Sequence, residues 1–178
     1  MNAGRSSPRS GVRGPDKIAR LEFEHTESNG CALMDGAFSE PRMELRPARP
    51  DDVSAVLALW RAAELPPSAT DDVDSVRRLI AHDPAALLVA EIGGEIVGSL
   101  CGTWDGWRGN LYRLAVHPHH RRKGIALKLV AFAERRISAL GGRRISLIAV
   151  DGDEHAVAFW WAAGYERDPR VSRFVKGR

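Results

Sequence analysis

The sequence predicts an α/β protein of the α+β kind, with a mixed central β-sheet of six to seven strands flanked by about four helices. Helix-type and strand-type hydrophobic periods alternate over residues 43–178 in the order β-α-α-β-β-β-α-β-α-β, with room for a closing strand. A hairpin signal, Gly93-Gly94, joins two of these strands directly. Because a hairpin makes its two strands antiparallel, a sheet that also contains βα units is expected to be mixed.

The chain is expected to form one domain. Its 178 residues, 44% of them hydrophobic, allow one ordinary core. Residues 1–41 lack sustained periodicity and are rich in small and polar residues, so we expect a disordered N-terminal extension before a domain at 43–178. Met34 and Met43 are alternative starts that would remove this extension. Without an apolar run of about 18 residues or a signal segment, we expect a cytoplasmic protein that does not bind membranes.

The first part of the domain carries a strand and two helices. A strand is expected over 43–48, followed by a helix that opens at Asp51 or Asp52 and ends before Pro66. A second helix is expected over 71–81. Its first turn holds three aspartates, where the helix dipole favours negative charge, and its apolar residues recur on one face.

Strands and helices alternate in the second part. The segment "ALLVAEIGGEIVGSLCG" contains the two hairpin strands, and "NLYRLAV" follows as another strand. A helix is expected from about 124 to 140, where Gly141 and Gly142 end it. Next, "RISLIAV" predicts a buried strand and Glu154–Ala163 a helix. The last residues predict one or two short strands.

The loop "HPHHRRKG" before the 124–140 helix has the composition of an anion-binding site. Gly124 lets the backbone pass close to a ligand, and residues 122–126 offer N–H groups at the start of a helix whose dipole adds positive potential. Arg121, Arg122 and Lys123 add charged donors, so a pyrophosphate fits both the charge and the geometry. Taken alone, these residues are more typical of an exposed basic turn that caps a helix.

Two segments resemble motifs of the GNAT superfamily of N-acetyltransferases. The segment "AVHPHHRRKGIALKLV" is similar to the motif V-x-P-x-x-[RQ]-x-x-G-x-[GA], with Arg121, Gly124 and Ala126 at signature positions. The segment "DEHAVAFWWAAGY" is similar to N-x-x-A-x-x-F-Y-x-x-x-G-[FY]. Both occur in the family's order, and the likeness covers about residues 43–178. More narrowly, "DGWRGNLYRLAVHP" resembles the small bacterial YpeA-like group.

The resemblance implies a GNAT fold in which the fourth and fifth strands splay apart around the pantetheine arm of acetyl-CoA. The backbone of Leu114, Ala115 and Val116 would pair with pantetheine. The pyrophosphate would be held by Arg121, Arg122, Lys123, Gly124, Ile125 and Ala126. The implied activity is an acetyl-CoA-dependent N-acyltransferase that passes the acetyl group directly to a primary amine of a small molecule, peptide or protein.

Two positions depart from the family pattern. Asp153 stands where the family usually has asparagine, and Trp160 stands where many members have the tyrosine that protonates the leaving thiolate. The resemblance still assigns both residues to cofactor binding. Because an indole is not a usable acid, a second interpretation stays open, a non-catalytic module that binds or senses acetyl-CoA.

The candidates for proton transfer are Asp105 and Tyr165. Residues 108–116 contain no acidic side chain, so Asp105 is the nearest carboxylate to that strand, although it also fits a turn residue that bonds its own backbone. Tyr165 and Tyr112 are the only tyrosines. Tyr165 also fits the family's aromatic position that packs under the sheet. An ordered water is a further route for the proton.

Other partners are not supported by the residue patterns. The net charge is only +3, and aromatic residues are not interleaved with the basic ones. We therefore expect no nucleic-acid binding. His117, His119 and His120 have no accompanying carboxylate or cysteine spacing, so we expect no metal and interpret them as solvated. Trp161 faces away from Trp160 on its helix and is a candidate contact for a homodimer.

Overall fold

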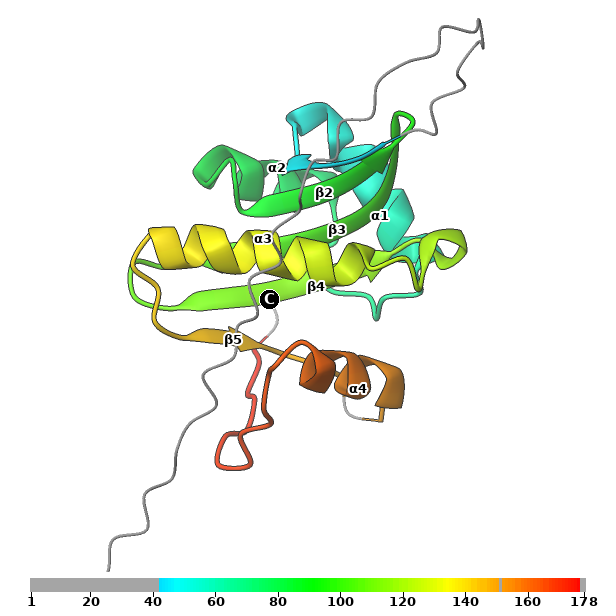
Figure 1. Ribbon diagram of the computed structural model, residues 1–178. Coiled ribbons are helices and arrows are strands. Elements are labelled where there is room, and N and C mark those ends of the chain that lie inside the picture. Colours follow the sequence, from blue (N-terminus) through cyan, green and yellow to red (C-terminus); the bar gives the residue numbers. More distant parts are fainter. Residues whose placement is uncertain (1–41, 151, 177–178) are drawn as a thin grey trace, which may run out of the picture. The chain divides into compact units, whose positions relative to one another are not determined.

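The computed structural model describes residues 42–150 and 152–176, so the expected extension at 1–41 lies outside the described residues. Five strands form one sheet in the order β1-β2-β3-β4-β5, flanked by four α-helices (Figure 1). The strands are β1 (Met43–Pro47), β2 (Leu87–Ile92), β3 (Glu95–Trp104), β4 (Gly109–Val116) and β5 (Ile145–Leu147). The helices are α1 (Val53–Ala62), α2 (Val73–His82), α3 (Ile125–Ala139) and α4 (Glu154–Ala162), with short 3-10 turns η1 (Pro50–Asp52) and η2 (Pro118–His120).

The sheet is mixed, which confirms the predicted fold class. Neighbouring strands from β1 to β4 are antiparallel, whereas β5 runs parallel to β4. The predicted β2–β3 hairpin turns at Gly93 and Gly94, whose φ angles are 60° and 86°. Both angles lie in the left-handed region that two-residue hairpin turns of this type require.

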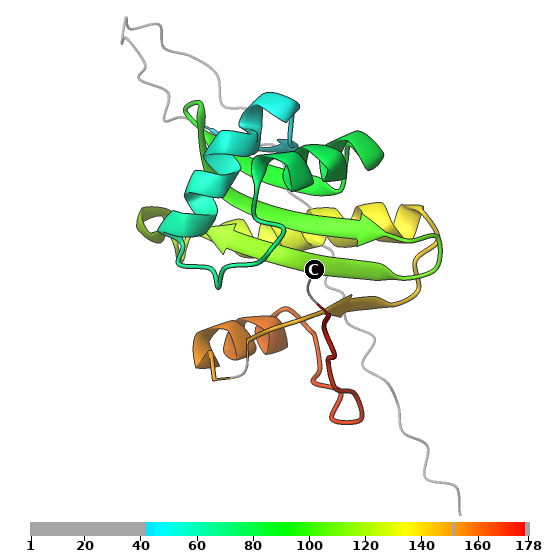
Figure 2. The same ribbon diagram turned by 180° about the vertical axis from the view of Figure 1, so that it is seen from behind.

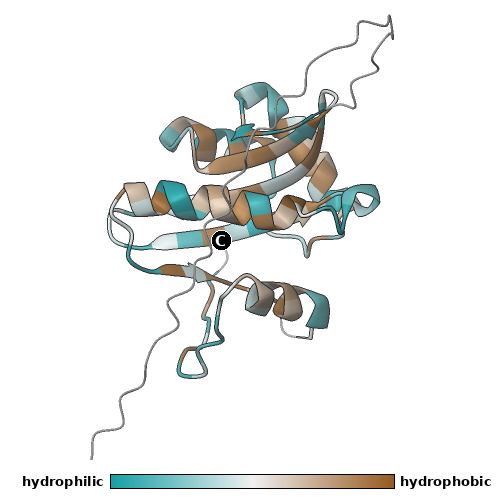
Figure 3. Ribbon diagram, viewed as in Figure 1, coloured by the Kyte–Doolittle hydropathy of each residue, from teal (hydrophilic) through white to brown (hydrophobic). Residues whose placement is uncertain are grey.

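Helices cover both faces of the sheet. Figure 1 shows α3 across one face, and Figure 2, seen from behind, shows α1 and α2 on the other. The alternation along β2 explains this, because Leu87 and Val89 pack with α1 and α2, whereas Leu88 and Ala90 pack with α3. All four side chains are buried, and in Figure 3 the central strands are correspondingly brown between the helices.

Helix α3 lies unusually close to the sheet because glycines face it. A Cβ at Gly98 would lie 2.8 Å from Ile125 Cγ2, and a Cβ at Gly102 would lie 2.9 Å from Ala133 Cβ. Side chains on the strand at these positions would push the helix outward. The glycines therefore let Ile125, at the start of α3, and Ala133 lie against β3.

The C-terminal part of the sheet differs from the prediction. We expected a buried strand over 144–150 and one or two closing strands, giving six to seven in total. The observed β5 has three partly buried residues, and Ile148 and Val150 beyond it are exposed. Among the described residues no strand pairs with the outer edge of β5.

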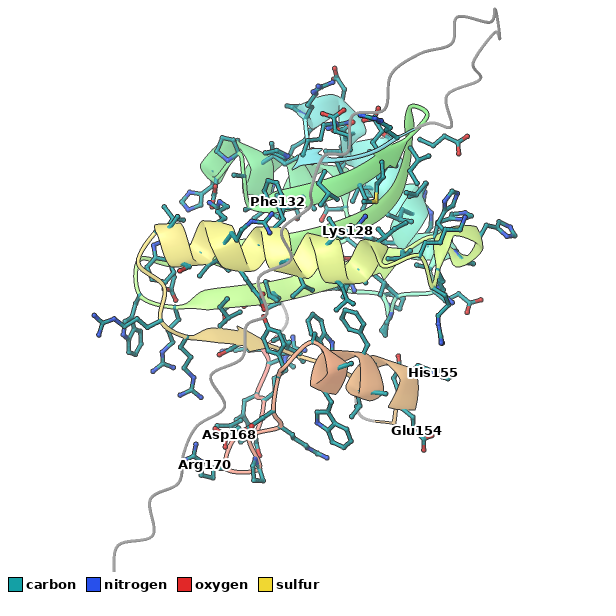
Figure 4. All side chains as sticks on the ribbon, in the orientation of Figure 1. Lys128, Phe132, Glu154, His155, Asp168 and Arg170 are labelled. Atoms are coloured by element: carbon teal, nitrogen blue, oxygen red, sulfur yellow. The ribbon has the colours of Figure 1, made fainter. Side chains whose placement is uncertain are left out.

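The segment after α4 forms a local turn in place of the expected strands. Asp168 accepts hydrogen bonds from both the backbone and the side chain of Arg170, and Figure 4 shows these two side chains together on the loop. Pro169 lies between them, and proline cannot donate to a ladder. The apolar residues of this segment, Val171, Phe174 and Val175, are exposed.

We expect Gly102→Ala to lower the free energy of unfolding by about 1–2 kcal/mol, because the new methyl group would overlap Ala133. Urea denaturation of the single variant, of Ala133→Gly and of the double variant forms a double-mutant cycle. In the Ala133→Gly background the same change should lose most of its effect. An equal loss in both backgrounds would show that the close approach of α3 is not what requires glycine.

Candidate functional site

Strands β4 and β5 separate soon after they begin to pair. Their ladder contains three residue pairs, from Gly109 with Ile145 to Leu111 with Leu147. Beyond Leu111, β4 continues to Val116 without β5 beside it. The expectation that these two strands splay apart is therefore confirmed.

A cleft of about 820 Å³ opens where the strands part. One wall is β4, through Tyr112 and Leu114, and the opposite wall is the chain after β5, through Ile148 and Val150. The loop after α1, the helix α2, the helix α4 with its N-cap, and the C-terminal segment complete the lining. Its volume is in the range of small-molecule sites. The exposed apolar residues after β5 thus form the wall of a cleft.

The loop before α3 presents a row of free backbone donors beyond the end of β4. Arg122 and Gly124 both have left-handed φ angles, 64° and 75°. The first helical hydrogen bond runs from the Lys128 N–H to the Gly124 carbonyl, and the N–H groups of residues 122–127 bond no described residue. Left-handed residues in such a loop turn successive N–H groups inward, which is the geometry of an anion-binding nest.

The exposed side chain of Arg121 is bonded to the backbone of two neighbouring elements. Its Nε donates to the Val116 carbonyl at 3.3 Å, and its Nη2 donates to the Ala63 carbonyl at 3.2 Å. Arg121 therefore ties the end of α1 to the end of β4. Ile125 is buried under the helix, so at this position only the backbone is available to a ligand.

A bulge in β4 is fixed by an ion pair with the loop after α1. Arg113 has a φ angle of 55°, rare for a residue with a side chain, and its register with β3 shifts there. Its guanidinium contacts the Asp71 carboxylate, with Nε to Oδ1 at 2.9 Å, and donates to the Pro66 carbonyl at 2.8 Å. The Trp60 ring lies 5.1 Å from the guanidinium. A strained backbone held by several contacts is typical of functional sites.

Below this bulge the Trp60 indole donates to the Ser99 Oγ at 2.9 Å, which satisfies the one polar side chain in the described core. Cys101, further along β3, is buried as well and belongs to the same core cluster as Trp60. Burial raises the pKa of its thiol to about 12, so Cys101 is not a nucleophile at neutral pH.

Helix α4 and its N-cap bring Trp160 and Asp153 to the cleft. Asp153 is the N-cap of α4, and its Oδ1 accepts from the Ala156 N–H at 2.9 Å. Trp160 lines the cleft and makes edge contacts with the rings of Phe159 and Tyr165, at centroid distances of 5.0 and 5.2 Å. The structure therefore brings these two expected residues and Leu114 to the same cavity.

Tyr165 does not line the cleft. Its ring packs against the α3 side of the sheet, and its hydroxyl donates to the Glu134 Oε1 at 2.8 Å. Burial, together with this hydrogen bond, raises the pKa of the Tyr165 phenol above its ordinary value. This geometry matches the core position that was the alternative for Tyr165.

Asp105 also lies outside the cleft lining, in the β3–β4 turn. Its Oδ1 accepts from the N–H groups of Trp107, at 2.8 Å, and Arg108, at 2.6 Å. Hydrogen bonds from the backbone N–H groups of Arg108 and then Trp107 hold the pKa of the Asp105 carboxyl below its ordinary value. The carboxylate is thus a weak base engaged in a turn, as its alternative interpretation described.

Tyr112 is a titratable residue of the cleft that no sequence motif singled out. It lies on β4, lines the cleft and is 42% exposed. Burial raises the pKa of its phenol, the nearby charge of Arg173 opposes this, and Asp105 reinforces it. The alternation of side chains along "NLYRLAV" could have drawn attention to Tyr112, because it places this residue on the face of the strand opposite to the buried Leu111.

The three loop histidines, which we expected to be solvated, lie side by side, and two of them are partly buried. The His117 ring lies 5.3 Å from that of His119 and 6.0 Å from that of His120. His117 and His120 are partly buried, and their Nδ1 atoms have no partner among the described residues. Within 42–150 and 152–176, no three His, Cys, Asp or Glu side chains are arranged to hold a metal ion.

Comparison with known proteins agrees with this geometry. The model of the acetyltransferase (GNAT) family matches residues 53–165. The chain belongs to the GNAT family. An acetyltransferase of Pectobacterium atrosepticum is 39% identical over 124 residues, which is 70% of this chain and 88% of that protein. Another, of Sodalis glossinidius, is 43% identical over 115 residues, 65% of this chain and 80% of that protein.

Solved structures share the fold of this GNAT protein. An aminoglycoside acetyltransferase from an uncultured soil metagenomic sample, in complex with trehalose, has a TM-score of 0.62 at 19% identity, over 76% of this chain and 96% of that one. AAC(6')-Iy in complex with the bisubstrate analogue CoA-S-monomethyl-acetylneamine has a TM-score of 0.62 at 19% identity, over 77% and 99%. At these identities the likeness concerns the fold alone.

The family and the named relatives make this GNAT protein an acetyl-CoA-dependent N-acetyltransferase. No helix in the described part of the chain has the length and apolar character to span a membrane.

The Arg113–Asp71 pair should be needed to keep the bulge at the cleft wall. We expect Asp71→Asn to lower the free energy of unfolding by about 1–3 kcal/mol, because it leaves the partly buried Arg113 charge uncompensated. Asp72→Asn is the matched control in urea denaturation. Asp72 caps α2, and asparagine caps a helix as well as aspartate does, so its cost should stay below about 0.5 kcal/mol. Equal costs for the two variants would contradict a special role for the pair.

Proposed function

We propose that this acetyltransferase passes the acetyl group of acetyl-CoA directly to the primary amine of a small molecule, peptide or protein in the β4–β5 cleft. The observation that carries the proposal is the position of the cleft. It begins where β5 leaves β4, and β4 leads from there to the free N–H groups of residues 122–127. An extended ligand with an anion at one end fits this arrangement.

The donor fits the loop and the open strand edge. The N–H groups of residues 122–126 would bind the pyrophosphate, helped by the exposed side chains of Arg122 and Lys123. Arg121 would hold the loop in position and not bind the pyrophosphate itself, because its guanidinium is already bonded to two backbone carbonyls. Along β4, one edge is occupied by β3, and the other is open from Tyr112 to Val116. The amides of pantetheine would pair with that open edge at Leu114, Ala115 and Val116.

The side chains around the cleft would orient the reactants. Acetyl-CoA supplies an activated thioester, so the protein has to place an amine against it and to manage the protons of the amine and the departing thiolate. Trp160 and Leu114 offer an apolar wall, and Asp153 fixes the start of α4 beside it. We do not assign proton transfer to Trp160, because indole has no usable acidic proton.

Tyr112 is the side chain that we propose for protonating the thiolate. It is two residues along β4 from Leu114, toward the end where the thioester would lie, and it faces the cleft. Of the two residues predicted for proton transfer, Tyr165 bonds Glu134 on the α3 side and Asp105 bonds its own turn. Tyr112 therefore provides an acid in place of the family's tyrosine, whose position Trp160 occupies.

We expect Gly124→Glu to weaken acetyl-CoA binding by at least about tenfold, because it places a negative charge beside the pyrophosphate site and strains a left-handed position. Calorimetric titration of the folded variant measures this. Gly94→Glu is the matched control, since Gly94 also has a positive φ angle and open space where a side chain would project. Wild-type affinity in the Gly124 variant would place the pyrophosphate elsewhere.

We expect Tyr112→Phe to lower kcat by about 100-fold while the acetyl-CoA dissociation constant stays within about twofold, because only a proton donor is lost. The assay measures coenzyme A release with the best amine from an acceptor screen. Tyr165→Phe is the comparison. It should cost about 1 kcal/mol of stability through its lost bond to Glu134 and leave kcat nearly unchanged.

The reverse pattern, with kcat lost in the Tyr165 variant alone, would contradict the role of Tyr112. Tight acetyl-CoA binding by the wild-type protein without thiol release from any amine would instead favour a non-catalytic sensing module.

A further inference from the structure

The charged side chains of the cleft carry information about the acceptor. Two carboxylates line it, Asp71 and Asp153, and both are already engaged. Asp71 accepts from the Arg113 guanidinium and from the Ser68 N–H at 2.9 Å. Asp153 accepts from the Ala156 N–H as a helix cap. The described lining therefore holds no free carboxylate to bind a second ammonium group on an acceptor.

Three arginines line the same cleft, and two of them form no ion pair with a described residue. Arg113 is engaged with Asp71 and the Pro66 carbonyl. Arg78, on α2, donates to the Ser75 Oγ at 2.9 Å and forms no ion pair with a described residue. Arg173, in the C-terminal segment, has no hydrogen-bond or ion-pair partner among the described residues. With two carboxylates and three guanidinium groups, the described part of the lining carries one net positive charge.

Arg173 shares the cleft with Tyr112. The positive charge of Arg173 opposes the burial that raises the pKa of the Tyr112 phenol. Tyr112 lies at the end of the open β4 edge where the acceptor amine would meet the thioester. A free guanidinium in this place would meet a group of the acceptor itself.

We infer that the acceptor is a small amine that also carries a carboxylate, bound by Arg173 and Arg78. This inference rests on the proposed function. A guanidinium presents paired N–H donors that match the two oxygens of a carboxylate, and its contacts are stronger when the partner is charged. A polycation would place its extra ammonium groups against these arginines without a free carboxylate to receive them. The side chains of this cleft thus favour another acceptor than the aminoglycosides named for structural neighbours of the same fold.

Coenzyme A release by the full-length protein tests the inference with matched pairs of amines. Each pair joins an amino acid to the amine that lacks its carboxylate, such as phenylalanine with phenethylamine and lysine with cadaverine. Dipeptides and phosphoethanolamine test whether a peptide carboxylate or a phosphate serves equally. Spermidine and sisomicin represent polycations. We expect kcat/KM to be about tenfold or more higher for the carboxylate member of each pair.

Variants connect this preference to the arginines. Arg173→Gln and Arg78→Gln should each raise KM for the carboxylate-bearing amines by about tenfold and change KM for their partners by less than about twofold. Acetyl-CoA binding should stay unchanged in both. Arg77→Gln, a neighbouring arginine on α2 outside the cleft lining, is the matched control and should behave as wild type.

Three outcomes would overturn the inference. Equal or better turnover of polycations, or unchanged discrimination within the amine pairs in both arginine variants, would refute an anionic acceptor while leaving the acetyl transfer intact. Thiol release from no amine at all, with normal acetyl-CoA binding, would refute the proposed transfer and this inference together.

Discussion

The parting of β4 from β5 after three residue pairs is the constraint on which the site depends. A parallel ladder that continued to Val116 would satisfy the open edge of β4 and fill the space beside it. Because β5 leaves at Leu147, the rest of β4 keeps an unpaired edge that points toward the N–H groups before α3. The early end of β5 therefore creates the cavity and leaves the backbone groups of β4 unpaired beside it. The same strand leads to the loop that we propose as the pyrophosphate site.

Two further interactions hold this opening in shape. On the α3 side, glycines at 98 and 102 let the helix lie directly on β3. On the α1 and α2 side, the ion pair of Arg113 with Asp71 holds a residue of β4 at a left-handed φ angle and ties it to the loop after α1. The wall of the cleft is thus positioned by contacts from both layers, as a preorganised site requires.

The sequence was informative where a local pattern determines local structure. The helices α1 to α4 and the β2–β3 hairpin lie close to their predicted ranges, because apolar periodicity, aspartate caps and paired glycines act over a few residues. The segment 144–150 could not be predicted correctly, because an apolar run looks the same whether it faces a core or lines a cleft. The same limit applies to the tyrosines. Tyr165 is kept out of the cleft by its hydrogen bond to Glu134, whereas Tyr112 reaches the cleft because of the face of β4 on which it lies. Neither contact can be read from the sequence.

Fold and acceptor are set by different parts of this protein. The fold is shared with solved acetyltransferases at 19% identity, so a backbone of this kind is preserved although most side chains differ. The charges that we infer to bind an acceptor come from Arg78 on α2 and Arg173 after α4, which both line the cleft. Both can change without disturbing the sheet, because exposed side chains on a helix surface and in an irregular segment contribute little to the core. Similarity of fold therefore says little about which amine is acetylated, and the balance of free guanidinium and carboxylate groups around Tyr112 is the more direct guide.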